Sequence, residues 1–225
     1  MGMGKTEAAL YAAYRMLEQG KDGGIYFALP TQLTSNKIHD RVNAFLSRIL
    51  LQDSLQTSLL LHGKAWLKTC SEQEMGEDAA AGKPWFQSGK RGLLAPFAVG
   101  TIDQALMAVI RVRHSAVRAF GLAGKVVIID EIHSYDTYTG TIIDELVALL
   151  RELKCTVIIL SATLTQPRRA AFLGTHQPAR TDYPLITAID SQSDRFIEVP
   201  GADENVLKLD RTVTLHSDKT QDAAL

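Results

Sequence analysis

Three short groups of residues have the types and spacing that nucleotide chemistry requires. The first, Gly2-Met3-Gly4-Lys5-Thr6, matches the last part of the phosphate-binding pattern G-x-x-x-x-G-K-[ST]. Glycine lets backbone N–H groups curl around phosphate oxygens, a lysine reaches the β- and γ-phosphates, and a threonine hydroxyl takes a Mg²⁺ position. The segment is therefore predicted to bind phosphate through Gly2, Gly4, Lys5 and Thr6. Within it, Lys5 is also a predicted catalytic residue and Thr6 a predicted Mg²⁺ ligand.

The second group is Asp130-Glu131, which directly follows the apolar run at 126–129. A strand that ends in two adjacent carboxylates places them where ligands bind in open α/β sheets. There Asp130 would hold Mg²⁺ through water, and Glu131 would orient and deprotonate an attacking water, so both are predicted catalytic residues. The plainer alternative is a strand that ends in a solvated acidic turn.

The third group is Ser161-Ala162-Thr163, at the end of the β-branched run at 156–160. Small hydroxyl side chains at a strand end can couple a nucleotide site to a nucleic-acid site. We predict this coupling role for Ser161 and Thr163, and for His133, which would bridge ATP and this group. The order and spacing of the three groups favour a nucleotide site over a solvated acidic turn.

Alternating short apolar runs and longer helical patterns must position these groups. Such alternation predicts an α/β fold with a mostly parallel sheet and helices on both faces. The predicted strands are 25–29, 59–61, 97–99, 126–129 and 156–160, with weak strand patterns at 197–199 and 212–215. The predicted helices are 6–19, a helix marked by Ile38, Val42, Phe45 and Ile49, and those at 102–112 and 141–153.

The bulk composition is that of a packed protein without a general affinity for nucleic acid. The 225 residues are 46% hydrophobic and 22% charged, and 24 basic side chains face 25 acidic ones. Any contact with nucleic acid must therefore be local. No uninterrupted apolar stretch approaches the roughly 20 residues that span a bilayer, so no membrane association is expected. Two cysteines far apart in sequence favour a reducing cytoplasm.

In this order, Gly4-Lys5-Thr6, the Asp-Glu-Ile-His box at 130–133 and the Ser-Ala-Thr group resemble motifs I, II and III of superfamily 2 DExH helicases. The resemblance implies a RecA-like P-loop NTPase fold and an ATP- and Mg²⁺-dependent helicase. Leu29-Pro30-Thr31 resembles motif Ia, and the sequence at 99–104 resembles the later element that holds DNA phosphates. This resemblance implies DNA contacts at Pro30, Thr31, Thr101 and Gln104. Both segments follow strand ends, as phosphate-positioning groups should.

Longer strings are similar to the CRISPR-associated Cas-three helicase-nuclease of type I interference. They include the text at 27–32, 61–63, 94–104 and 121–136, and the match extends from residue 1 to about Leu164. The resemblance implies an antiviral motor that hydrolyses ATP and pulls single-stranded DNA in the 3′-to-5′ direction after recruitment by the Cascade surveillance complex. In that family a metal-dependent HD nuclease domain then cuts the DNA.

The expected organisation is a first RecA-like ATP-binding domain over 1–182, with a polar insertion at about 71–92, and a connector over 183–225 toward a second RecA-like domain. The first loop glycine and the strand presenting the loop would fall before residue 1, so the domain is expected to be truncated at its N-terminus. That strand would normally pair on both sides, so its loss is expected to leave two neighbouring strands unpaired.

The sequence departs from the family pattern in its missing parts. No HD nuclease pattern is present, and neither is the second RecA-like domain that carries the arginine finger, so we expect residues 1–225 to be inactive alone. Both domains would be partners on the same or a separate chain. Two alternatives stay open: the motor domain of another superfamily 2 helicase, such as a restriction-system translocase, and a non-catalytic fragment that binds DNA or a partner.

Overall fold

The computed structural model describes residues 4–50, 58–61, 91–110, 112–174, 180–181, 183–190 and 195–200. The chain forms two compact units, Met1–Phe172 and Leu173–Leu225. The first unit contains the three groups of residues with nucleotide chemistry. The predicted connector that begins at residue 183 lies within the second unit.

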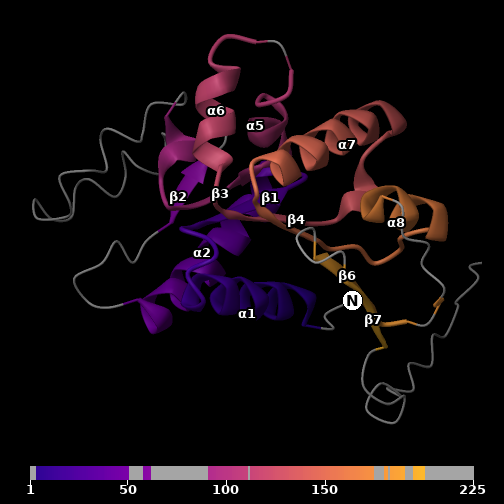
Figure 1. The fold of residues 1–225 in the computed structure, drawn as a ribbon. Coiled ribbons are helices and arrows are strands. Elements are labelled where there is room, and N and C mark those ends of the chain that lie inside the picture. Colours follow the sequence, from indigo (N-terminus) through magenta and orange to yellow (C-terminus); the bar gives the residue numbers. More distant parts are fainter. Residues whose placement is uncertain are drawn as a thin grey trace, which may run out of the picture. The chain divides into compact units, whose positions relative to one another are not determined.

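The first unit is built on a five-stranded sheet in which every pairing is parallel (Figure 1). Its strands lie in the order β2-β3-β1-β4-β5. They are β1 (Ile25–Leu29), β2 (Leu59–Leu61), β3 (Phe97–Thr101), β4 (Val126–Ile129) and β5 (Thr156–Ile159). The five strands predicted for this part of the chain are therefore confirmed.

Helices cover both faces of this sheet, as predicted (Figure 1). One face is covered by α1 (Lys5–Glu18) and α2 (Gln32–Ile49), and the other by α5 (Ile102–Leu106), α6 (Ser115–Leu122) and α7 (Thr137–Glu152). The unit is completed by α8 (Gln166–Leu173) and two 3₁₀ turns, η1 (Gly92–Leu94) and η2 (Ile132–Ser134). This is the RecA-like α/β architecture.

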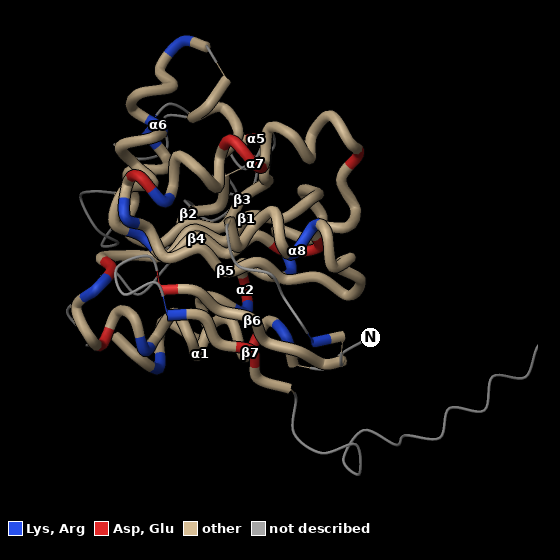
Figure 2. Tube along the Cα trace, turned by 45° about the vertical axis from the view of Figure 1, so that its right-hand side comes forward, with Lys and Arg blue, Asp and Glu red and all other residues tan. Residues whose placement is uncertain are grey.

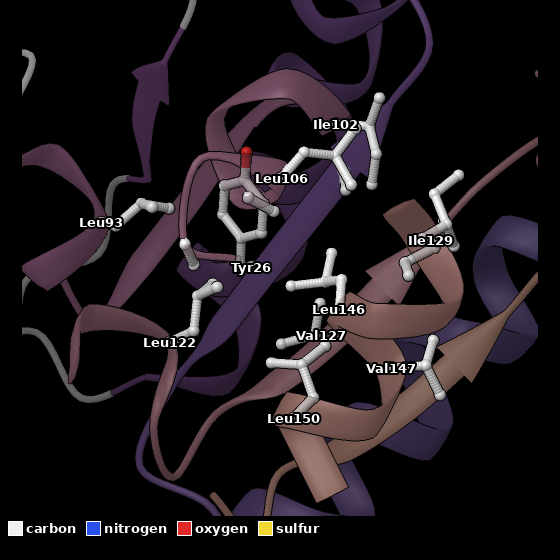
Figure 3. Close-up of a cluster of buried hydrophobic side chains, with 14 of the residues drawn as sticks. Tyr26, Leu93, Ile102, Leu106, Leu122, Val127, Ile129, Leu146, Val147 and Leu150 are labelled. Atoms are coloured by element: carbon white, nitrogen blue, oxygen red, sulfur yellow. The ribbon is translucent and has the colours of Figure 1, made fainter. Parts of the chain in front are cut away.

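The central strand β1 divides the core into two layers. Its odd-numbered residues, such as Phe27, pack with α1 and α2, whereas Tyr26 and Ala28 pack with α5 and α7. Every residue of β1 is buried because helices cover both faces. A strand in this setting reads as a continuous apolar run, which is why the sequence identified it. Figure 3 shows Tyr26 beside Leu106, with Leu146 of α7 in the same cluster.

Two helices differ from their predicted bounds. The helix expected over 102–112 ends at Leu106, because Ala108 and Val109 bond to the carbonyls three residues earlier and the chain leaves the α-helical ladder. Ile110 and Val112, which continued the apolar pattern, are exposed, whereas Ala108 stays buried. Conversely, the helix expected from residue 141 begins at Thr137, because the Asp136 side chain accepts a hydrogen bond from the Thr139 N–H.

Every neighbouring pair of strands in the five-stranded sheet is hydrogen-bonded. The expectation of a gap between two unpaired strands is therefore wrong, because β1 and β4 pair directly at the centre of the sheet. Among the described strands, β5 has one partner, β4, and all four of its residues are partly exposed. In the described sheet β2 is likewise an edge strand, with β3 as its partner, so β2 and β5 form the two edges.

The second unit contains an antiparallel pair, β6 (Leu185–Asp190) and β7 (Arg195–Pro200), with Leu185 opposite Pro200. The strand pattern at 197–199 is confirmed within β7. The pattern at 212–215 lies outside the described residues, as does the predicted insertion at 71–92 apart from Arg91 and Gly92. In the described parts of the chain, no helix is both long and apolar enough to cross a membrane.

Candidate active site

The predicted site residues follow the carboxyl ends of parallel strands. Pro30 and Thr31 follow β1, Asp130 follows β4 and Ser161 follows β5, while Thr101 closes β3. Because parallel strands present their carboxyl ends at one edge, these residues share that edge of the sheet. It is the edge at which open α/β sheets bind ligands.

The start of α1 has the backbone geometry of an anion-binding turn. Gly4 caps the helix with φ 70° and ψ 16°, a left-handed conformation that glycine adopts without strain. A Cβ at Gly4 would meet nothing within 4 Å, so the space beside this turn is open. The first N–H groups of a helix have no partner within it and attract negative charge. Gly2 lies outside the described residues.

Lys5, in the first turn of α1, lies close enough to Asp130 for its positive charge to lower the pKa of that carboxyl. Burial is the larger effect and raises the Asp130 pKa overall, and the charge of Glu131 raises it further. Asp130 is 9% exposed, and its Oδ1 accepts a hydrogen bond of 2.8 Å from the Glu131 N–H. A desolvated carboxylate that faces a lysine is suited to hold a cation or a hydrated cation.

Glu131 has a left-handed backbone, with φ 54° and ψ 42°. For a residue with a Cβ this conformation is strained, and such strain concentrates at functional sites. The conformation starts η2 and brings His133 back toward the carboxylate, so that His133 Nε2 lies 3.0 Å from Glu131 Oε2. The predicted acidic box is thus held as one unit by its own imidazole.

The imidazole of His133 also joins the acidic box to the strand end of β5. His133 Nδ1 lies 3.1 Å from Ser161 Oγ, and the Thr163 N–H donates to the same Oγ at 3.3 Å. Since a carboxylate only accepts, the arrangement with a neutral imidazole has Nε2–H donating to Glu131. The Ser161 hydroxyl then donates to Nδ1, and every link of the chain from Thr163 to Glu131 has a donor and an acceptor.

The predicted Mg²⁺ donors fit a hydrated ion. Asp130 supplies a carboxylate, and within the described residues the Thr6 hydroxyl makes no hydrogen bond that would compete with a metal. A Mg²⁺ ion bound through one or two protein oxygens, phosphates and water needs no larger protein cage. No cluster of three or more His, Cys, Asp or Glu side chains occurs among the described residues, as this mode of binding allows.

Two of the residues predicted to contact DNA, Thr31 and Thr101, make hydrogen bonds within the fold. Thr31 is exposed and caps α2, where it accepts from the Thr34 N–H at 3.2 Å. Thr101 is buried, and its carbonyl accepts from the Tyr26 hydroxyl at 2.8 Å. Pro30 is partly exposed. Thr31 and Thr101 thus have hydrogen-bond partners of their own, separate from the hydrogen bonds that His133 makes.

Gln104 is positioned by an arginine that the sequence analysis did not identify. The Arg118 Nη1 donates to Gln104 Oε1 at 3.0 Å, and Arg118 itself is 9% exposed. Burial lowers the pKa of this guanidinium. A lone arginine in an apolar segment gives no sequence signal of such a role. By contrast, the Asp136 cap had a signal, since aspartate is one of the preferred residues at the N-cap of a helix.

Lys125 is a second buried cation outside the predicted set. Its Nζ donates to the carbonyls of Leu93, at 2.6 Å, and Ala95, and the side chain is 6% exposed. Burial lowers its pKa to about 8. Lys125 lies directly before β4, so it ties the η1 turn to the strand that ends in the acidic box.

Residues 1–171 match the family model described as DEAD/DEAH box helicase. The chain is 44% identical over 184 residues to a CRISPR-associated endonuclease/helicase Cas3 of Thermus thermophilus, across 77% of the chain and 20% of that protein. It is 33% identical to the Cas3 of Escherichia coli K12 over 201 residues, which are 82% of the chain and 22% of that protein. It therefore spans about a fifth of the length of these curated relatives.

Solved structures give the same relationship. The crystal structure of T. fusca Cas3-ATP is 36% identical and has a TM-score of 0.74, over 88% of this chain and 24% of that one. A chain in a structure described as a CRISPR RNA-guided surveillance complex, pre-nicking, is 34% identical with a TM-score of 0.61, over 88% and 21% of the two chains. The likeness covers sequence and fold together.

Proposed function

The chain belongs to the DEAD/DEAH box helicase family, and on that premise we propose that it is an ATP-driven motor domain of type I CRISPR interference. In this role it binds ATP and Mg²⁺, and it pulls single-stranded DNA in the 3′-to-5′ direction after recruitment by Cascade. The single observation that carries the proposal is the series of side-chain contacts from Glu131 through His133 to Ser161, with Asp130 and Lys5 nearby. These contacts join the proposed hydrolysis site to the carboxyl end of β5.

Each residue of the site has a task in ATP hydrolysis. The turn at Gly4 and the N–H groups that start α1 hold phosphate oxygens, with Gly2 contributing a further backbone N–H. Lys5 neutralises the terminal phosphates. Thr6 and Asp130 hold Mg²⁺, which when bound supplies positive charge to the phosphates. Charge stabilisation and positioning are the main contributions to phosphoryl transfer.

Glu131 orients and deprotonates the attacking water. Its carboxylate already accepts from His133 Nε2, so one oxygen is held in place while the other faces the reaction. The strained backbone at Glu131 sets the direction of the side chain before ATP arrives. His133 and Ser161, with Thr163, transmit the state of this carboxylate to the edge that holds DNA.

DNA contacts at Pro30, Thr31, Thr101 and Gln104 are local, as the charge balance requires. The net charge is −1, and Figure 2 shows basic and acidic residues interspersed along the described trace. Helix starts at the carboxyl edge supply N–H groups for DNA phosphates, and these contacts position the strand without reading its sequence.

The proposed partners are single-stranded DNA, the Cascade complex, a second RecA-like domain and an HD nuclease domain, and the proposed location is the cytoplasm. Support comes from the similar chain in a structure described as a CRISPR RNA-guided surveillance complex, and from relatives described as endonuclease/helicase. Cys155, a free thiol, is in keeping with a reducing compartment.

The test is binding of a fluorescent ATP analogue with and without Mg²⁺. We expect Mg²⁺-dependent binding that Lys5→Ala weakens at least tenfold, since the substitution removes a charge-assisted contact worth about 1.5–3 kcal/mol. The matched control is Lys21→Ala, which removes an exposed lysine beyond the other end of α1. A chain that binds the analogue equally well with and without the Lys5 side chain would contradict the loop assignment. Absence of any Mg²⁺-dependent binding would favour a non-catalytic fragment.

A further inference from the structure

The hydroxyl of Tyr135 is a buried polar group that the proposed hydrolysis does not use. Within the described residues its oxygen is buried and has no hydrogen-bond partner. A buried hydroxyl without a partner destabilises the state in which it occurs, whereas a phenylalanine would fill the same space without that cost. The hydroxyl at this position therefore points to a use in a different state of the molecule.

Tyr135 lies where the acidic box and the DNA-side element meet. It closes η2, four residues after Glu131, and its ring packs against the core cluster that contains Ile102 of α5 and Ile132 of η2. The helix α5 contacts α7, which begins two residues after Tyr135. The cluster against which Tyr135 packs thus contains residues of the 3₁₀ turn at the acidic box and of the helix that follows β3.

Carboxylates of both elements act on this hydroxyl. Burial has the largest effect and raises the Tyr135 pKa, and the charges of Asp103, Asp130 and Glu131 raise it further. Asp103 lies in the first turn of α5, between the predicted DNA contacts at 101 and 104. The phenols of Tyr26 and Tyr135 are also close enough to affect each other. The buried hydroxyl is therefore an unpaired donor within electrostatic range of carboxylates on two elements.

We propose that Tyr135 is a positioning residue that couples the DNA-side turn at 101–104 to Asp130 and Glu131; this inference rests on the proposed function. An unpaired donor within electrostatic range of carboxylates on two elements can pair with either of them once one element moves. A ligand that shifts α5 or the acidic box favours one of these pairings over the other. DNA on the 101–104 turn thereby selects the pairing that holds the acidic box in its hydrolytic position.

The experiment compares ATP hydrolysis by the full-length protein with and without single-stranded DNA. Tyr135→Phe should reduce the DNA-stimulated kcat about tenfold, the effect of one lost hydrogen bond to a charged group, with KM for ATP unchanged. The melting temperature should stay level or rise, because an unpaired hydroxyl is removed. The matched control is Tyr138→Phe, whose side chain is 78% exposed in the first turn of α7. It should change neither rate nor stability.

Tyr26→Phe supplies the contrast for a structural hydroxyl. The Tyr26 phenol donates to the Thr101 carbonyl at 2.8 Å, so its loss should lower the melting temperature. If Tyr135→Phe lowers the melting temperature as Tyr26→Phe does, the hydroxyl has a structural role and the inference is wrong. The inference is also wrong if Tyr135→Phe raises KM at constant kcat, which would assign the hydroxyl to ATP binding.

The two proposals fail in different ways. A parent protein without DNA-stimulated hydrolysis would overturn the proposed function, and this inference with it. If DNA stimulates ATP hydrolysis equally in the parent protein and in the Tyr135→Phe variant, this inference alone is wrong.

Discussion

At the scale of single residues, the direction of the hydrogen bonds that run from Thr163 through Ser161 and His133 to Glu131 is determined by the two end groups. The Thr163 N–H only donates and the Glu131 carboxylate only accepts, so a neutral imidazole between them has one arrangement that satisfies all groups. The direction of each hydrogen bond from Thr163 to Glu131 is thereby set by the chemistry of the two end groups.

Glu131→Gln is predicted to separate nucleotide binding from hydrolysis. The amide keeps the size of the side chain and its contact with His133 Nε2, but it cannot take a proton from water. We expect ATP-analogue affinity to stay within about twofold while kcat falls by roughly 10²–10⁴ in the full-length protein. Steady-state hydrolysis is the measurement, and Glu145→Gln, an exposed carboxylate on α7, is the control. Unchanged turnover would remove Glu131 from the proposed role.

Ser161→Ala tests the other end of the same chain. It removes the partner of His133 Nδ1 and the acceptor of the Thr163 N–H, which lie at 3.1 and 3.3 Å from Ser161 Oγ. A neutral hydrogen bond contributes about 0.5–1.5 kcal/mol, so a roughly 2- to 10-fold loss of DNA-stimulated kcat is expected. Ser134→Ala in η2 is the matched control. If both variants retain the parent rate, the coupling assigned to Ser161 is wrong.

At the scale of elements, the sequence was most informative where burial was complete. The fully buried strands β1 and β4 have their predicted bounds because continuous runs of hydrophobic residues form them. The partly exposed strand β2 also has its predicted bounds. The helix α6 was not predicted, since it starts at the left-handed residue His114 without a side-chain cap and leaves Phe120 exposed. A helix without a capping signal or a consistent apolar stripe has no pattern to recognise.

The site shows the same division between local signals and long-range contacts. Asp130 and Ser161 each follow a parallel strand, so the sequence predicted them at the same edge, and His133 contacts Ser161 there. The pairing of Gln104 with Arg118 was not predictable, since each residue has many possible partners and the contact depends on how α5 and α6 pack. The functional roles of the site residues stay predictions.

Lys125 makes the link between η1 and β4 dependent on pH. Its pKa in the fold is about 8 against an ordinary 10.5, so between these values the unfolded chain holds a proton that the folded chain lacks. The Lys125 contribution to the free energy of unfolding therefore rises as pH rises from about 8 to 10.5, by at most about 1.4 kcal/mol per pH unit. Below pH 8 the cost of burying the charge is present in full.

Urea unfolding at several pH values between 8 and 10 would measure this contribution. Lys125→Met should remove the upward slope relative to the parent chain, whereas Lys37→Met, at an exposed position on α2, should keep it. A slope shared by the parent and Lys125→Met would show that Lys125 is not the group responsible.

At the scale of the whole molecule, the exposed edge strand β5 determines whether isolated chains associate with one another. The residues of β5 are partly exposed, and Val157, Ile158 and Ile159 are apolar. An apolar edge strand is a template for pairing with another chain. We therefore expect residues 1–225 alone to associate with increasing concentration.

Light scattering and size-exclusion chromatography would detect this association, with Ile158→Lys as the test variant. A lysine on an edge strand opposes pairing between chains, so the variant should be less associated than the parent if its melt stays cooperative. Leu33→Lys is the matched control, because Leu33 is 71% exposed on α2, away from β5 in the sheet order. A parent chain that stays monomeric at all concentrations would contradict the prediction.

The left-handed backbone at Glu131 has a consequence for how this sequence can evolve. Glycine or asparagine would adopt φ 54° at less cost, by about 1–2 kcal/mol for glycine, so selection for stability alone favours replacing the glutamate. Selection for hydrolysis opposes that change. A lineage that stops needing ATP turnover should therefore lose the carboxylate at this position early, while the buried Asp130 persists longer. The residue at position 131 would then record whether a descendant still works as a motor.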